Sequence, residues 1–224
     1  MAPFPISGYV LAGGHSSRLG RDKALVELGG RPLVEYAVSK VRRVCAEVHI
    51  LAGAEGEHAS LAQYAPLVHD LHPGCGPVGG FEAALAHSSR EWNLFRPVDM
   101  PFLTTALLED WVRATLGEES SGARIARFTV DGLPQGALAL LHREVLPYVA
   151  AAIEGRRFKV FSVLEEAGRE LAAKRELPVG TVFRNSGFSS KPGRVGATEH
   201  LWFANVNTPE ELAEAEAHLD ALDA

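Results

Sequence analysis

The chain has 224 residues, of which 46% are hydrophobic and 22% charged, a composition that excludes wholesale disorder and supplies enough apolar side chains for a sizeable core. Its 22 basic and 28 acidic residues give a formal net charge of −6, which argues against a protein that coats nucleic acid or an anionic membrane. Two cysteines cannot form a disulfide framework, and no apolar run approaches a membrane span or a secretion signal, so we expect a soluble, cytoplasmic protein with neither nucleic-acid nor membrane partners.

Short apolar runs alternate with amphipathic stretches through the first half of the chain. Strands are expected at residues 9–12, 48–52, 67–68 and 94–98. We expect the last of these to end before Asp99, because Pro97 lacks the amide donor of a central strand. Helices are expected at 78–86, at 107–116 and from Pro32 onward, where apolar side chains recur on one helical face at Leu33, Ala37, Val41 and Val44. This alternation predicts βαβ units and a mainly parallel sheet.

The second half is less regular. Residues 125–130 and 136–141 flank the hairpin signal Asp131-Gly132, and we expect Pro134 to lengthen the connection. Helices are expected at 144–153 and 159–171, and residues 184–198 are expected to form a long loop whose Lys191 and Arg194 either close over an anion or are solvated. A final helix is marked by Thr208 as N-cap, Pro209 and a capping box to Glu211, with one apolar face made of Leu212, Ala215, Leu219 and Leu222. We interpret residues 1–224 as one doubly wound α/β domain.

The densest chemical signal follows the first strand. Residues 11–23 read Leu-Ala-Gly-Gly-His-Ser-Ser-Arg-Leu-Gly-Arg-Asp-Lys. Glycines let the backbone approach a ligand, and Arg18, Arg21 and Lys23 supply charge for phosphate oxygens. The spacing fits neither G-x-x-x-x-G-K-[ST] nor G-x-G-x-x-G. The alternative interpretation is a strand-to-helix turn with solvated basic side chains.

Polar side chains also follow later strands. Asp70 and Asp99 come at expected strand ends, where carboxylates can share a Mg²⁺ ion with substrate phosphates or can simply cap a turn. Asn205 and Asn207 alternate, so both side chains point to the same side of an extended segment, toward a ligand or as turn formers. His69, Asp70, His72 and Cys75 match no standard zinc spacing.

Four motifs occur in order along the chain and together resemble the molybdenum cofactor guanylyltransferase family. Residues 11–23 resemble its L-A-G-G-x-S-x-R-M-G-x-D-K signature, and Gly76-Pro-Val-Gly-Gly80 is similar to its G-P-L-A-G. Val98-Asp99-Met-Pro101 resembles its C-D-x-P, and residues 205–212 match its N-x-N-T-P-E-[DE]-[LF].

The resemblance implies a Rossmann-like nucleotidyltransferase that moves GMP from GTP to molybdenum-molybdopterin and releases pyrophosphate, with Mg²⁺ or alternatively Mn²⁺ as cofactor. It implies catalytic roles for Arg18, Lys23 and Asp99, with Asp99 as the metal ligand. It implies nucleotide contacts, largely in the N-terminal half, from Leu11, Ala12, Gly13, Gly14, Lys23, Asp70, Gly76, Pro77, Val78, Gly80 and Asp99. Molybdopterin contacts, in the C-terminal half, are implied for Arg156, Arg157, Asn205 and Asn207. Molybdoenzymes or cofactor-delivery proteins are the macromolecular partners that it suggests.

Three positions depart from the family pattern. Gly79 stands where Ala is usual, Val78 replaces Leu, and Leu51-Ala52-Gly53 follows the second strand where some members carry an asparagine. These departures bear on the base more than on the reaction. A cytidylyltransferase acting on molybdopterin or another phosphorylated small molecule is therefore one alternative, and a non-catalytic protein that binds nucleotide or molybdopterin is another.

Overall fold

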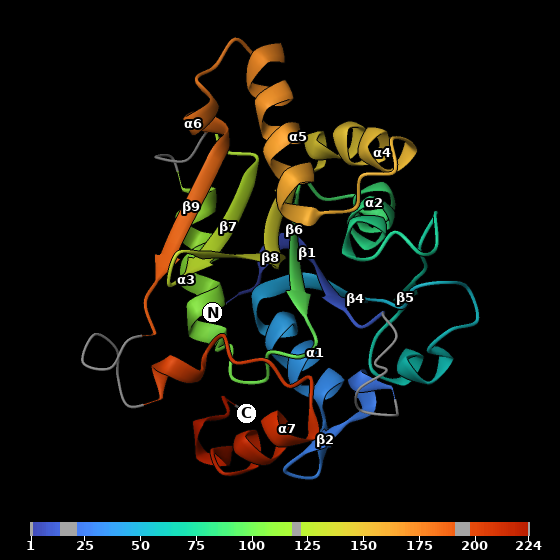
Figure 1. Ribbon diagram of the computed structural model, residues 1–224, viewed down its shortest axis with the longest axis vertical. Coiled ribbons are helices and arrows are strands. Elements are labelled where there is room, and N and C mark those ends of the chain that lie inside the picture. Colours follow the sequence, from blue (N-terminus) through green and yellow to red (C-terminus); the bar gives the residue numbers. More distant parts are fainter. Residues whose placement is uncertain (1, 14–21, 118–121, 191–197, 224) are drawn as a thin grey trace.

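The fold, taken from a computed structural model, is described for residues 2–13, 22–117, 122–190 and 198–223. Within these ranges a central sheet has the strand order β5-β4-β1-β6-β8-β7-β9 (Figure 1). Only β8 runs antiparallel to its neighbours, so the predicted mainly parallel sheet is confirmed. The strands are β1 (Phe4–Leu11), β4 (Cys45–Leu51), β5 (Leu67–Val68), β6 (Trp92–Pro97), β7 (Ile125–Val130), β8 (Leu133–His142) and β9 (Phe183–Phe188).

Helices cover both faces of the sheet, as expected for a doubly wound fold. On one face α1 (Leu33–Val44) and α3 (Thr105–Leu116) share a core with Ile6 and Val10 of β1. On the other face α2 (Pro77–His87), α4 (Leu146–Glu154) and α5 (Val160–Lys174) pack with Tyr9 of the same strand. The alternation of β1 side chains between the two cores follows from the two-residue period of a strand.

Close backbone approach fixes the position of α1 against β1. Pro32 is the residue before the helix, and the predicted face of Leu33, Ala37, Val41 and Val44 is buried. A Cβ atom added to Gly8 of β1 would lie 2.2 Å from Val41 Cγ1 and 2.8 Å from Cys45 Sγ. The helix can pack this near to the sheet only because residue 8 has no side chain.

The hairpin between β7 and β8 differs from expectation in its length. Asp131 (φ 49°) and Gly132 (φ 84°) alone make the turn, and Val130 pairs directly with Leu133. Pro134 does not lengthen the connection, because it pairs with Thr129 and the register shift falls between Arg127 and Thr129 instead. Two left-handed residues match the twist of paired strands, which favours this short turn.

The expectation of a long loop at 184–198 is wrong for its first part. Residues 184–188 belong to β9, which pairs in parallel with β7 from Ile125 to Val130 at the edge of the sheet. A strand of this kind, with polar residues and Gly187, carries little apolar periodicity and is stabilised by its ladder to β7. Lys191 and Arg194 lie outside the described residues.

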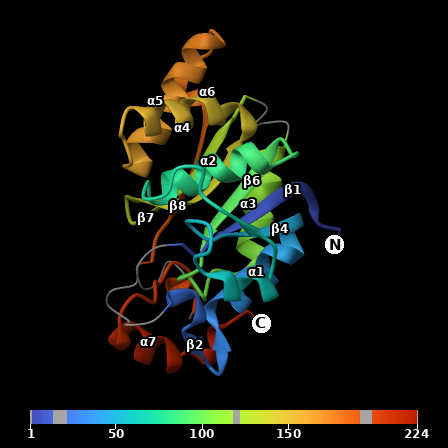
Figure 2. The ribbon, with the colours of Figure 1, turned by 90° about the vertical axis from the view of Figure 1, so that its right-hand side faces the viewer.

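The predicted capping box is confirmed at α7 (Pro209–Glu216), but the helix is shorter than expected. His218 leaves the helical region at φ −126° and ψ 33°, which breaks the register that would place Leu219 over Ala215. Figure 2 shows α7 beside the short strand β2 (Glu27–Leu28), which pairs with β3 (Arg31–Pro32), and Gly29 N donates to Glu216 Oε1 at 2.9 Å there. A four-residue helix, α6 (Val179–Val182), precedes β9.

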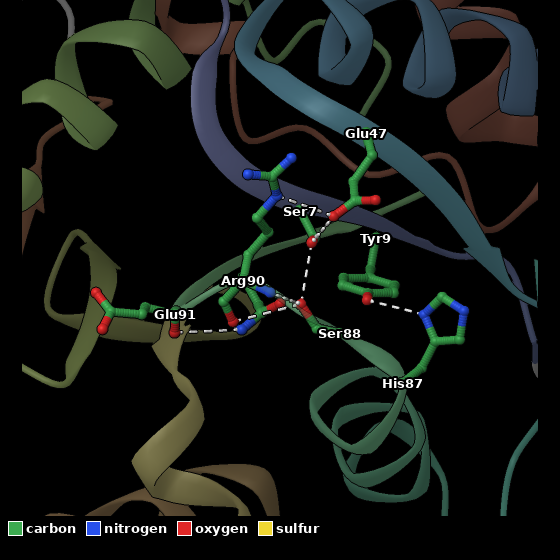
Figure 3. Close-up of polar contacts among 8 residues, drawn as sticks. Ser7, Tyr9, Glu47, His87, Ser88, Arg90 and Glu91 are labelled. Carbon is green, nitrogen blue, oxygen red and sulfur yellow. Dashed lines mark hydrogen bonds and ion pairs between the residues drawn. The ribbon is translucent and has the colours of Figure 1, made fainter.

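A polar network joins β1, β4 and the α2–β6 connection (Figure 3). Ser7 Oγ donates to Glu47 Oε1 at 2.7 Å and lies 3.0 Å from Ser88 Oγ, while Arg90 Nε lies 3.3 Å from the same Glu47 oxygen. Because Ser7 and Ser88 are buried, these bonds satisfy groups that would otherwise destabilise the fold. No helix among the described residues is long and apolar enough to cross a membrane.

One lysine, Lys40 of α1, lies in the core with none of its surface exposed. Its Nζ donates to the carbonyl of Pro101 at 2.7 Å. Burial, with a smaller contribution from the nearby positive charge of Arg96, lowers the pKa of Lys40 from 10.5 to about 7. The folded protein therefore favours the neutral amine, whereas the unfolded chain keeps the charge up to the ordinary pKa.

The free energy of unfolding should consequently rise with pH above about 7, by at most about 1.4 kcal/mol per pH unit, because the unfolded chain then holds a proton that the folded protein has released. Below that range both states are charged and the penalty of the buried charge is fully present. Urea unfolding between about pH 6.5 and 9.5 measures this slope, and Lys40→Met should lack the part due to Lys40. Equal slopes in the two proteins would contradict the assignment.

Candidate active site

A cleft of about 720 Å³ opens at the carboxyl ends of the parallel strands. Its walls come from the ends of β1, β4 and β6, the segments after β4 and β5, and the start of α2. Parallel strands meet with their carboxyl ends at one edge, so residues far apart in the chain converge there. The volume is within the range of small-molecule sites.

Most of the residues implied for nucleotide contact line this cleft. They are Leu11, Ala12, Gly13, Lys23, Asp70, Gly76, Pro77, Gly80 and Asp99. Val78 does not line it: the side chain points the other way and is fully buried in the core under α2. Gly14 and Arg18 lie outside the described residues, as does Arg21.

Backbone atoms at the ends of β1 and β4 form part of the cleft lining, at Ala12, Gly13 and Gly53. The amides of Ala12 and Gly13 both donate to the carbonyl of Leu51, at 3.1 and 3.0 Å, which holds the end of β1 against the end of β4. A Cβ on Gly13 would lie 3.0 Å from the amide nitrogen of Gly53. Gly53 (φ 73°) adopts a conformation that glycine tolerates best, so both segments can border a ligand without side chains between them.

A charged cluster made of Lys23, Asp99 and Asn207 lies at one end of the cleft. Lys23 Nζ is 2.5 Å from Asp99 Oδ2 and also donates to Asn207 Oδ1. Lys23 begins a 3₁₀ turn that the Asp22 side chain caps, Asp99 follows β6, and Asn207 precedes α7. Three remote segments thus place a cation, a carboxylate and an amide within hydrogen-bonding distance.

Asp99 retains a free oxygen suited to a metal ion. Its Oδ1 is buried and has no hydrogen-bond partner within the described residues. Those residues hold no group of three or more His, Cys, Asp or Glu side chains that could bind a metal alone. Mg²⁺ at phosphate-transfer sites is commonly held by one or two carboxylates together with substrate phosphates, so the arrangement fits such an ion.

Two further carboxylates, Asp70 and Glu57, line the cleft. Burial raises the pKa of Asp70 above its usual value, and the negative charge of Glu57 raises it further. The Asp70 amide donates to the carbonyl of Gly53 at 2.8 Å, and Asp70 Oδ2 lies 3.3 Å from where a Cβ on Gly79 would sit. The family's usual Ala at position 79 would therefore press on this carboxylate. Carboxylates here suit hydrogen-bond donors such as ribose hydroxyls or base amines.

Sequence reasoning singled out Leu51-Ala52-Gly53 at the end of β4 but missed the residues that follow them as a wall of the cleft. Glu57 and His58 line it, and His58 Nδ1 is 2.5 Å from Asp22 Oδ2. That contact ties the 54–58 segment to the residue beside Lys23. No motif marks these positions, and only the rule that loops after parallel strands border the site could have pointed to them.

The residues implied for molybdopterin contact are not all brought together. Asn207 lines the cleft, whereas Asn205 does not, although the following amide of Val206 donates to the carbonyl of Asp99 at 2.9 Å. Arg156 and Arg157 also lie away from the cleft lining, and Arg157 Nε is 3.2 Å from Glu166 Oε2. Besides Asn207, the second half of the chain contributes Ala137 of β8.

The combination of His69, Asp70, His72 and Cys75 forms no metal site among the described residues. His72 Nδ1 is 2.8 Å from Glu82 Oε2, and Cys75 is buried in the core. His72 thus has a structural partner in Glu82, and Cys75 is part of the packing.

Comparison with known proteins places the geometry in context. The family model described as the MobA-like NTP transferase domain matches residues 8–170. A molybdenum cofactor guanylyltransferase from Vibrio atlanticus is 33% identical over 217 residues, which cover 96% of this chain and 97% of that protein.

Two solved structures share the fold. Molybdopterin-guanine dinucleotide biosynthesis protein A from Archaeoglobus fulgidus has a TM-score of 0.73 at 24% identity and covers 97% of this chain and 100% of that one. The 4-diphosphocytidyl-2C-methyl-D-erythritol synthase from Anaerococcus prevotii has a TM-score of 0.64 at 14% identity, with 96% of each chain covered. At these identities the likeness concerns the fold alone.

Proposed function

The chain belongs to the MobA-like NTP transferase family and is a nucleotidyltransferase, and from this premise we propose that it transfers GMP from GTP to the terminal phosphate of molybdenum-molybdopterin and releases pyrophosphate. The observation that carries the proposal is the charged cluster of Lys23, Asp99 and Asn207 at the end of the cleft. The cluster combines two cleft residues of the N-terminal half with Asn207, which together with Ala137 makes up the described cleft lining from the C-terminal half.

The chemistry asks little of the protein beyond position and charge. The attacking group is a phosphate oxygen that is already ionised near neutral pH, so no general base is needed. Two anions must be held in line, and charge that grows on the leaving pyrophosphate must be neutralised. Lys23 donates to phosphate oxygens once it leaves Asp99, and Asn207 offers an amide to the acceptor side.

A divalent cation completes the proposed site. Mg²⁺, or Mn²⁺ in its place, would be held by Asp99 through the free Oδ1 and by the phosphates of the nucleotide, where it supplies charge neutralisation. Asp70 and Glu57 in the cleft lining would accept hydrogen bonds from the nucleoside. We assign nucleotide binding to the N-terminal half, which supplies most of the described cleft lining, and molybdopterin binding to the C-terminal half, which supplies Ala137 and Asn207.

The test is pyrophosphate release from the purified protein with Mg²⁺ and molybdate-loaded molybdopterin, comparing GTP, CTP and ATP, with identification of the product by mass. We expect release with GTP and a guanine dinucleotide product, and no release without molybdopterin. Release with CTP alone would support the same reaction with cytosine in place of guanine as the base. The fold is compatible with that outcome, because a protein named for a cytidyl product shares it. If folded protein released no pyrophosphate with any of the three nucleotides, the proposal would be contradicted.

A further inference from the structure

Two basic side chains are buried beneath Asp99. Lys40 of α1 and Arg96 of β6 both have none of their surface exposed, and both face the core that lies between the sheet and α1. Neither forms an ion pair with a residue in the described part of the chain. Burying a basic group without a direct counter-ion destabilises a protein, because the group either keeps a desolvated charge, as Arg96 does, or gives up its proton above about pH 7, as Lys40 does, so two such side chains at one place require a reason.

Both side chains donate to the turn that carries Asp99. Arg96 Nη2 lies 2.6 Å from the carbonyl oxygen of Met100, and Lys40 Nζ lies 2.7 Å from that of Pro101. The carbonyl of Asp99 itself accepts the amide of Val206 at 2.9 Å. Three consecutive carbonyls are thus fixed by three different segments, one from β6, one from α1 and one from the strand-like segment before α7.

This arrangement determines where the Asp99 side chain can point. With the carbonyls of residues 99–101 held toward the core, the backbone presents the carboxylate at the cleft, with Oδ2 on Lys23 and Oδ1 buried without a hydrogen-bond partner among the described residues. A cation ligand needs such a fixed direction, because a carboxylate that rotates loses part of its affinity to conformational entropy.

A purely structural role explains the two basic side chains less well. A neutral donor would satisfy a carbonyl at lower desolvation cost, and Arg96 leaves Nε and Nη1 without partners among the described residues. The negative charge of Asp99 favours the charged form of Arg96, opposing the burial that lowers its pKa to about 10. The guanidinium therefore stays charged at neutral pH, and Asp99 is the carboxylate that stabilises it.

We propose that Arg96 and Lys40 are positioning residues for Asp99: through the carbonyls of Met100 and Pro101 they hold its carboxylate in the orientation that binds the divalent cation of the nucleotide. This rests on the proposed function only in taking Asp99 as the ligand of that cation. The charged guanidinium of Arg96 forms a stronger hydrogen bond than a neutral donor would, which suits a turn that must not move.

The test measures how much Mg²⁺ tightens GTP binding, as the ratio of dissociation constants obtained by calorimetry in EDTA and in Mg²⁺. In Arg96→Met and Lys40→Met this ratio should fall to within about twofold of the value for Asp99→Asn, while GTP binding in EDTA changes less than about twofold. Arg96→Lys, which keeps the charge and a donor, should retain the wild-type ratio. In turnover, kcat should fall with little change in the KM for GTP.

Simple electrostatics predicts the opposite pattern. Loss of the positive charge of Arg96 near the site would weaken GTP binding in EDTA and leave the Mg²⁺ ratio equal or larger, because a cation would be repelled less. That pattern would overturn the proposal. The measurement needs no molybdopterin and no turnover, so it remains decisive even if the assay of the proposed function is silent.

The matched control is Tyr36→Phe. Tyr36 also lies on α1 and donates from a buried side chain to a backbone carbonyl, that of Leu28 at 3.0 Å, remote from Asp99. It should leave the Mg²⁺ ratio unchanged even if it lowers stability as much as Lys40→Met does. Urea unfolding verifies that each variant is folded at the assay temperature. Should Arg96→Met not fold, Lys40→Met carries the same prediction, since Met closely matches the length of the lysine chain.

Discussion

Asp99→Asn should lower the rate of pyrophosphate release by about three orders of magnitude or more, while GTP binding in the absence of metal stays within about threefold of wild type. The amide has nearly the size of the carboxylate and can still accept from Lys23, so the cleft keeps its shape. It carries no charge, however, and is a poor ligand for Mg²⁺, which prefers carboxylate oxygen at such sites. The substitution should therefore lower the rate of nucleotidyl transfer much more than it lowers the affinity for the nucleotide.

The measurement is single-turnover pyrophosphate release at saturating GTP, with calorimetric GTP binding in EDTA beside it. Asp110→Asn is the matched control, because it makes the same chemical change at an exposed carboxylate of α3 that pairs with Arg113 at 2.6 Å. It should be indistinguishable from wild type. Comparable turnover with and without the Asp99 carboxylate would remove it from the catalytic machinery and leave the metal role without support.

Lys23→Ala should weaken GTP binding about a hundredfold and GMP binding no more than about threefold. A lysine is a point charge, and the β- and γ-phosphates, which GMP lacks, hold most of the negative charge that it can meet. In the free protein the same ammonium group is bonded to Asp99 and Asn207. It must exchange these partners for phosphate oxygens, so the variant loses an interaction that only the triphosphate makes.

Calorimetric titration of GTP, GDP and GMP in Mg²⁺ measures the difference between the ligands. Lys174→Ala, at the exposed end of α5, removes a lysine of the same kind far from the cleft lining and should change none of the three affinities. Equal losses for GTP and GMP would place Lys23 beside the nucleoside or in a structural role rather than at the outer phosphates.

Local patterns predicted most of the secondary structure. The strand before the glycines, the buried face of α1, the Asp131-Gly132 turn and the capping box of α7 were all predicted from residues close together in the chain and are confirmed. Each depends on a short-range rule: side-chain period, left-handed turn conformations, or a side chain that satisfies a free amide nearby. The errors have a common character, since β9 and the early end of α7 depend on contacts or dihedrals that no periodicity records.

The candidate site was predictable in part. The motif residues that line the cleft lie at strand ends or helix starts, where topology alone directs them to one edge. Val78 was misjudged because a motif position does not say which way a helical side chain points, and it points into the core. The segment around His58 was missed because its role arises from a contact with Asp22, which is 36 residues away.

The amino-acid sequence by itself therefore determined the class of fold, the order of the elements and the identity of the chemical groups available for phosphate transfer, because these follow from composition, periodicity and motifs. Only the tertiary structure decided which of those groups meet. The approach of Lys23 to Asp99 and Asn207, and the burial of Lys40 and Arg96 beneath the Asp99 turn, depend on the strand order of the sheet and on the packing of α1 against it. Contacts between segments so distant in the chain are selected by the free energy of the whole fold, so no local stretch of sequence encodes them.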